Sequence, residues 1–80
     1  MRLDKYLKVS RLIKRRTVAN EACDAGKVMV NGRPARASYD VKTDDLIEIT
    51  LGARALKVQV LDVSEHVTKD AASLLYQIVE

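Results

Sequence analysis

The chain has 80 residues, which is enough for one domain with a thin hydrophobic core but too few for a second domain. Phe and Trp are absent, and the single cysteine and single histidine can form neither an internal disulfide nor a closed zinc site. We therefore expect one domain over residues 1–80, without metal or cofactor, in a reducing cytoplasm. No apolar run near the N-terminus is suited to a signal peptide or a membrane span, so we expect no contact with membranes.

Positive charge is concentrated in the first half of the chain. Residues 1–36 hold ten Lys or Arg against three acidic residues, a net charge of +7. Residues 37–80 hold four Lys or Arg against eight acidic residues, a net charge of −4. An asymmetry this strong predicts a polyanionic partner for the first half, although a merely solvated basic helix face would give a similar count.

The spacing of apolar residues predicts a first short helix over residues 3–9. Leu3, Tyr6 and Leu7 share one face of such a helix. Asp4 falls in its first turn, where a negative charge suits the helix dipole. Leu12 and Ile13 are expected to pack inward where this helix ends.

A second helix is predicted over residues 17–25, with Thr17 as its N-cap and Gly26 as the residue that ends it. The expected buried stripe consists of small side chains, namely Val18, Ala19, Ala22 and Cys23. Cys23 is therefore interpreted as a core residue and not as a nucleophile.

After Gly26 the pattern changes to that of strands. A strand over 28–30 leads into the turn signal Asn31-Gly32, and 33–36 is an extended edge because Pro34 cannot occupy a central strand. Residues 47–51 and 56–60 alternate as two half-buried strands joined by a turn at 52–55. In the tail, Asp70 could cap a helical turn through Leu75, and residues 76–79 fit either its continuation or a final strand.

Nothing in the sequence predicts catalysis. There is no glycine-rich phosphate loop, no nucleophile beside a base and no spacing of metal ligands. We interpret Asp44-Asp45 as a solvated turn and His66 as an exposed loop residue. Tyr39 and Tyr76 are interpreted as packing residues, and no aromatic platform for stacking bases is evident.

The strongest functional signal is the basic run that precedes the second helix. Cations at a helix N-terminus cost the free protein about 0.3–1 kcal/mol each, and they become favourable when a phosphate binds there. Glu21 and Asp24 on the exposed face of that helix disfavour a DNA major groove, so structured RNA is the better match. The expected RNA-binding residues are Arg2, Lys5, Arg11, Lys14, Arg15, Arg16, Lys27 and Arg33.

Several ordered segments resemble the S4 RNA-binding domain over about residues 1–50. They are Arg2-Leu3-Asp4-Lys5-Tyr6-Leu7, Arg15-Arg16-Thr17-Val18-Ala19, Ala25-Gly26-Lys27-Val28-Met29-Val30-Asn31-Gly32, and Ser38, Val41 and Asp45. The resemblance implies an α+β, S4-like fold, in which two N-terminal helices pack on a small, mainly antiparallel sheet. Residues 51–80 would extend that sheet and end in a short helix or strand. Many S4 domains carry Ser-Arg where this chain has Arg15-Arg16.

The opening MRLDKYLKVSRLIKRRTVANE is similar to the RqcP group of stand-alone S4 proteins, which also contains small heat-shock ribosome-binding proteins. This similarity implies binding to ribosomal RNA of a large subunit obstructed by peptidyl-tRNA. It also implies support of alanine tailing of the stalled chain beside an NEMF-type partner. A heat-shock-type subunit recycling or assembly factor is the alternative, and a protein-interaction module is a further one. We expect a monomer that is not an enzyme.

Overall fold

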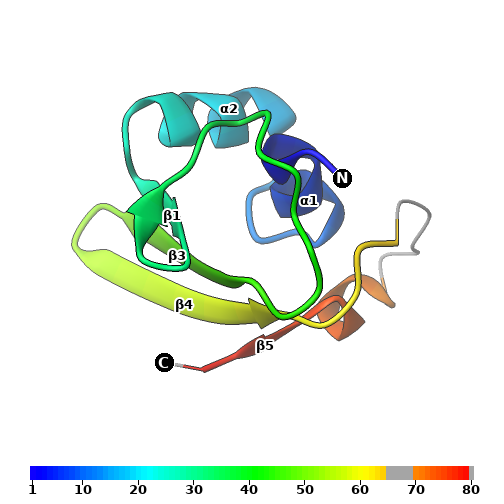
Figure 1. Ribbon diagram of the computed structural model, residues 1–80. Coiled ribbons are helices and arrows are strands. Elements are labelled where there is room, and N and C mark those ends of the chain that lie inside the picture. The colour runs from blue at the N-terminus through cyan, green and yellow to red at the C-terminus, as the bar shows by residue number, and fades with distance from the viewer. Residues whose placement is uncertain (65–69, 80) are drawn as a thin grey trace.

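The computed structural model describes residues 1–64 and 70–79 of the chain. Two α-helices come first and the strands follow, with a 3₁₀ helix before the last strand (Figure 1). In chain order the elements are α1 (Leu3–Val9), α2 (Arg16–Asp24), β1 (Val28–Val30), β2 (Arg33–Pro34), β3 (Leu46–Leu51), β4 (Arg54–Val60), η1 (Ala72–Leu74) and β5 (Tyr76–Ile78).

The strands form an antiparallel five-stranded sheet in the order β2-β1-β3-β4-β5. Val30 pairs with Arg33 across the β1–β2 turn, where Asn31 and Gly32 both have positive φ, 52° and 83°. Two consecutive left-handed residues make the tight hairpin turn that Asn-Gly favours, so the predicted turn is confirmed. Pro34 lies in β2 at the edge of the sheet, also as predicted.

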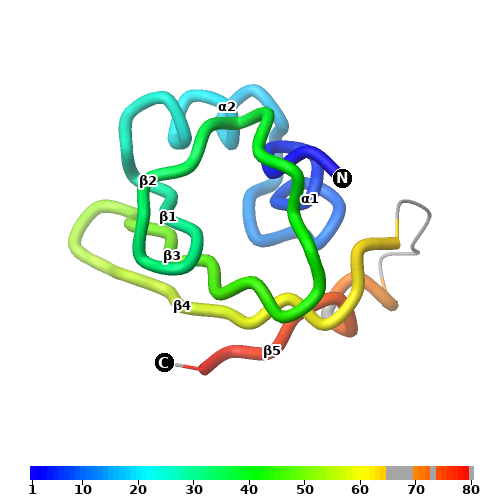
Figure 2. The backbone as a smooth tube through the Cα atoms, in the orientation of Figure 1, coloured from blue at the N-terminus to red at the C-terminus, as the bar shows by residue number. Residues whose placement is uncertain are grey.

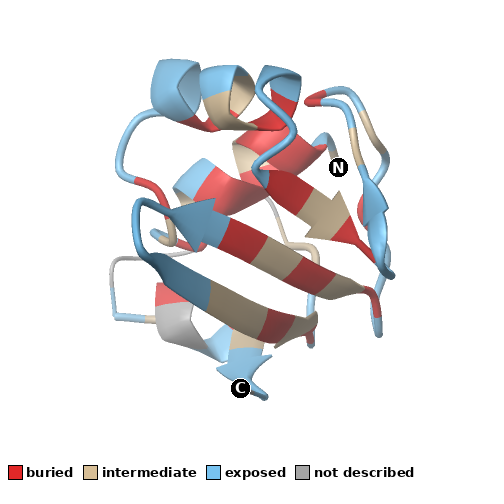
Figure 3. Ribbon diagram, turned by 90° about the vertical axis from the view of Figure 1, so that its left-hand side faces the viewer, coloured by how far each residue is buried: buried red, intermediate tan, exposed pale blue. Residues whose placement is uncertain are grey.

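Both helices cover one face of the sheet, and the core lies between these layers (Figure 3). Leu3, Tyr6 and Leu7 of α1 are fully buried, and Ile47 and Ile49 of β3 alternate with exposed or half-buried neighbours. This alternation is the reason for the striped burial of β3 and β4 in Figure 3. The α+β, S4-like arrangement expected from the sequence is confirmed.

The connection from β2 to β3 runs beside α1 instead of looping into solvent (Figure 2). The amide of Leu3 donates to the carbonyl of Tyr39 at 2.8 Å, and the amide of Asp4 donates to the carbonyl of Ala37 at 3.2 Å. These bonds satisfy free amides at the N-terminus of α1. They also fix residues 36–40 against the start of the first helix.

Several predictions at element ends are corrected. The second helix begins at Arg16, and its N-cap is Arg15 without a side-chain bond, so Thr17 is not the cap. Val18 is 45% exposed and does not belong to the buried stripe, whereas Cys23 is buried as predicted. Gly26, with a φ of +74°, follows the helix end as expected.

In the second half, one turn departs from prediction and the tail takes one of its predicted alternatives. The β3–β4 turn is only residues 52–53, because Leu51 already pairs with Arg54. In the tail, η1 is followed by β5, so residues 76–78 form the final strand. The Tyr6 hydroxyl donates to the carbonyl of Leu75, between these two elements, at 2.8 Å. Burial raises the pKa of Tyr6, so this hydroxyl keeps its proton. The prediction for His66 lies outside the described residues.

Asp45 contradicts the interpretation of Asp44-Asp45 as a solvated turn. Asp44 is exposed, but Asp45 is 8% exposed and its carboxylate accepts three hydrogen bonds. The donors are Asn31 Nδ2 at 3.0 Å, the Tyr39 hydroxyl at 2.9 Å and the Lys42 amide at 2.9 Å. Asp45 therefore ties the β1–β2 turn to the connection that leads into β3.

Candidate nucleic-acid interface

A buried carboxylate holds two arginines together where α1 and α2 begin. Asp4, whose side chain is 3% exposed, accepts a hydrogen bond from Arg2 Nε at Oδ1, at 3.1 Å. Its Oδ2 lies 3.3 Å from Arg16 Nε and accepts a bond from Asn20 Nδ2, also at 3.3 Å. The amide of Lys5 completes the set at 2.8 Å. We call Arg2, Asp4, Arg16 and Asn20 the Asp4 cluster.

Asp4 remains ionised because its hydrogen bonds outweigh its burial. Burial alone would raise the pKa of this carboxyl. Bonds from Arg2, Arg16 and Asn20 and from the Lys5 amide nevertheless hold its pKa below the usual value of 3.8. The anion therefore persists at neutral pH and keeps both guanidinium groups in place.

The two guanidinium groups of the cluster still face solvent. The Arg2 side chain is 51% exposed and that of Arg16 is 46% exposed. Each guanidinium has five donors in a planar fork, and the bonds to Asp4 use only some of them. The remaining donors are available for a second anion. A shallow hollow between Asp4, Arg16, Thr17, Asn20 and Glu21 lies beside them.

The other predicted basic residues of the helical half lie along α1, in the connection to α2 and at the N-cap of α2. Arg15 is the N-cap of α2 and exposed, directly beside Arg16. Arg11 and Lys14 lie exposed in the connection between α1 and α2, and Arg11 has a φ of 63°. Lys5 is half-buried one turn along α1 from Arg2.

Two of the predicted residues lie away from the cluster. Lys27 follows the C-terminal end of α2, about 14 Å along that helix from Arg16. It lines a different groove, between α2 and the β3–β4 turn, with Val18 and Leu51. Arg33 lies on edge strand β2. The eight residues therefore do not form one compact site.

Sequence reasoning missed Asp4, Asn20 and Arg36 as members of this surface. Arg36 immediately precedes Ala37, whose carbonyl accepts the amide of Asp4, so it lies beside the Asp4 cluster. Asp4 could have been noticed from its place three residues before buried Leu7, on the inward side of α1. The position of Arg36 depends on the long β2–β3 connection, for which no local pattern exists.

No group of metal ligands is found among residues 1–64 and 70–79. Burial raises the pKa of Cys23 to about 11, with added repulsion from Asp4 and Asp24, so its thiol is a poor nucleophile. In the same described residues, no helix is long and apolar enough to cross a membrane.

Comparison with known proteins assigns this architecture to a class. The family model described as S4 domain matches residues 1–47, which is more than half of the chain. The chain therefore belongs to the S4 domain family, as the sequence resemblance indicated.

Similar proteins indicate one group within the S4 domain family. A protein of Streptococcus pneumoniae named RQC P-site tRNA stabilizing factor is 51% identical, over 99% of this chain and 90% of its own length. A protein of the same name in Bacillus subtilis is 46% identical, over 100% and 93%. The structure of Vibrio cholerae heat shock protein 15, described as trimeric, superimposes with a TM-score of 0.91 at 29% identity, over 99% of this chain and 81% of that one. These relationships support a role in ribosome quality control.

Proposed function

We propose that this protein is a non-catalytic cytoplasmic factor that binds large ribosomal subunits carrying a stalled peptidyl-tRNA. In this role it supports alanine tailing of the nascent chain beside an NEMF-type partner. Residues 1–80 act as one domain, with the S4 motif in 1–50 and the sheet extension in 51–80. The relatives named RQC P-site tRNA stabilizing factor support the choice of tRNA and ribosome as partners.

The Asp4 cluster is the observation that carries this proposal. Two arginines from different helices are fixed by one buried anion while about half of each side chain stays exposed. Fixed guanidinium groups bind a phosphate with less loss of side-chain entropy than flexible ones do. We expect Arg15, directly beside Arg16, to add to this contact and Lys5 to extend it along α1. Arg11 and Lys14, in the connection after α1, would make further phosphate contacts. Lys27 and Arg33 would make separate, outlying phosphate contacts.

Co-sedimentation with large subunits tests the proposal. Wild type is compared with Arg2→Ala/Arg16→Ala, with and without peptidyl-tRNA on the subunit, at two salt concentrations. A matched control is Arg54→Ala/Lys57→Ala, which removes two charges from β4, on a hairpin far from the N-terminus (Figure 1). We expect binding that requires peptidyl-tRNA, weakens with salt and is lost only in the first variant. Equal binding by both variants would refute the contact surface and favour a protein-interaction module.

A recycling factor for free subunits is the second candidate, because the Vibrio cholerae neighbour is a heat shock protein of nearly the same fold. Deleting the gene distinguishes the two. Loss of alanine tails supports the first function, whereas accumulation of unrecycled or precursor subunits supports the second.

The proposed state is a monomer, although the neighbour in Vibrio cholerae is described as trimeric. Sedimentation equilibrium over a range of protein concentrations decides between them. A single species of 8.9 kDa is the expected result.

A further inference from the structure

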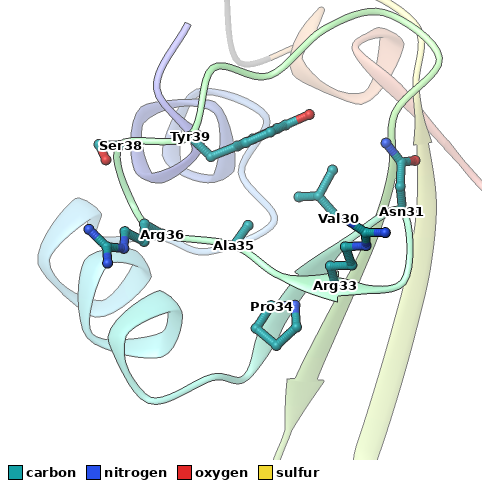
Figure 4. A pocket seen from close by; sticks show the side chains of 8 residues that line it. All are labelled: Val30, Asn31, Arg33, Pro34, Ala35, Arg36, Ser38 and Tyr39. Atoms are coloured by element: carbon teal, nitrogen blue, oxygen red, sulfur yellow. The ribbon is translucent and has the colours of Figure 1, made fainter.

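A hollow of about 670 Å³ lies between β2 and the connection that follows it, next to the segment that is bonded to Asp4. Its volume falls in the range of small-ligand sites. Figure 4 shows Tyr39 on one side of the hollow and Pro34 on the other, with Val30 and Ala35 between them. These walls are aromatic or apolar. Its remaining lining residues are Asn31, Arg33, Arg36 and Ser38.

Internal bonds occupy two of the polar groups here, and others remain available. The Tyr39 hydroxyl donates to Asp45, and the Asn31 side chain is bound to Asp45 and to the Leu46 amide. The bond to Asp45 fixes the orientation of the Tyr39 ring. A ligand in the hollow would therefore contact the ring and not the hydroxyl. Within the part of the chain that the structure describes, Arg33 and Arg36 form no ion pair.

The two arginines lie at opposite ends of the hollow. Arg33 lies at the end beside Asn31, whereas Arg36 extends from the opposite rim toward α2 (Figure 4). Arg36 also adjoins Ala37, which is bonded to Asp4, so this rim continues into the Asp4 cluster. A strand of RNA that contacts Arg2 and Arg16 could therefore continue along Arg36 to the hollow without leaving positively charged surface.

We propose that this hollow is a subsite for one unpaired nucleotide of RNA, whose base contacts Tyr39 and Pro34 and whose flanking phosphates contact Arg33 and Arg36. Single-stranded RNA is recognised in this way, by bases stacked on aromatic side chains and phosphates held by arginine. An acidic peptide would use the arginines but would not need a flat ring. The proposal rests on the proposed RNA-binding function, and it assigns to Tyr39 a role that the sequence alone did not indicate.

Titration with AMP, followed by amide shifts in two-dimensional NMR, tests the subsite, with ribose 5-phosphate and an acidic peptide as comparison probes. We expect AMP to shift amides between residues 33 and 39 in a saturable way and more strongly than either comparison probe. Tyr39→Leu should weaken AMP about fivefold or more, since stacking of one base is lost. Tyr39→Phe should retain AMP binding, because it keeps the ring.

A second variant guards against misfolding of Tyr39→Leu. Arg33→Ala/Arg36→Ala changes two exposed side chains and should also weaken AMP, whereas Arg54→Ala/Lys57→Ala should not. Equal shifts from AMP and ribose 5-phosphate, preference for the peptide, or shifts centred on Arg2 and Arg16 would each overturn the subsite. Large-subunit binding that persists without AMP binding would refute the subsite alone. AMP binding without any subunit binding would refute the proposed function alone.

Discussion

Asp4→Asn is the perturbation that most directly tests how the arginines are held. The substitution keeps the shape of the side chain and removes its charge, leaving Arg2 and Arg16 without an anion. A hydrogen bond to a charged group contributes about 1.5–3 kcal/mol, and breaking a fully buried pair costs about 3–5 kcal/mol. Because both arginines are about half exposed, solvent screening reduces these values. We expect a loss of about 2 kcal/mol in the free energy of unfolding at pH 7.

The stabilisation that Asp4 provides should depend on pH in a definite direction. The pKa of Asp4 is lowered in the folded state, so the folded protein binds this proton more weakly than the unfolded chain does. Its contribution is therefore present above the unfolded value, near 3.9, and disappears as pH falls through the lower folded pKa. Urea unfolding of both proteins between pH 7 and pH 2.5 should show two stabilities that converge below about pH 4. A gap that stays the same at all pH values would refute the role of the charge.

The RNA affinity of Asp4→Asn shows whether Asp4 positions the two arginines or only contributes negative charge. Asp4→Asn raises the net charge by one, so attraction to a polyanion by charge alone would strengthen binding. If the carboxylate instead positions Arg2 and Arg16, affinity should fall about three- to tenfold. A filter-binding or co-sedimentation titration against large subunits, at a temperature where both proteins are folded, measures the direction. Tighter binding by the variant would contradict the positioning role.

Three further predictions concern single features of the structure. Tyr6→Phe should lower the free energy of unfolding by about 1 kcal/mol in urea titrations, because the Leu75 carbonyl loses the Tyr6 hydroxyl and keeps only the amides of Leu61 and Asp62 as donors. Gly32→Ala should lower the free energy of unfolding by about 1 kcal/mol in the same assay, because alanine is strained at a φ of +83°. No neighbour lies close enough to clash with the added carbon, so the backbone strain is the whole effect. Arg2→Ala/Arg16→Ala should make the slope of log affinity against log salt shallower by about two, when affinity for large subunits is measured between 50 and 200 mM salt.

The elements governed by local pattern could be predicted from the sequence. The bounds of α1, the Asn31-Gly32 turn and the alternation in β3 follow from periodicity and turn chemistry, which depend only on neighbouring residues. Val18 was wrongly predicted to be buried. Its position on the inward face of α2 does not show whether the sheet extends far enough to cover it. Its partners would have to come from the β3–β4 hairpin, where Leu51, the last residue of β3, is also 46% exposed.

The candidate site could be predicted only in part. A run of basic residues announces positive charge, but the distance between Arg2 and Arg16 depends on how two helices pack. Asp45 shows the same limit, because its three donors come from the β1–β2 turn and the β2–β3 connection. Buried carboxylates of this kind depend on partners distant in sequence, so a polar pair in a loop resembles any solvated turn.

The position of Asp4 also explains how this fold tolerates arginine at two helix N-termini. Arg2 is the N-cap of α1 and Arg16 opens α2, and neither helix has a side-chain cap. Positive charge at these ends opposes the helix dipole, and α2 has no acidic residue in its own first turn. One carboxylate, located where both helices begin, offsets the two guanidinium groups and the positive end of each helix. Since Asp4 is nearly inaccessible, it repels an incoming phosphate less than an exposed acid would, because the exposed guanidinium groups lie between them. An acid buried under a basic surface is thus compatible with RNA binding in a way that the same acid on the surface is not.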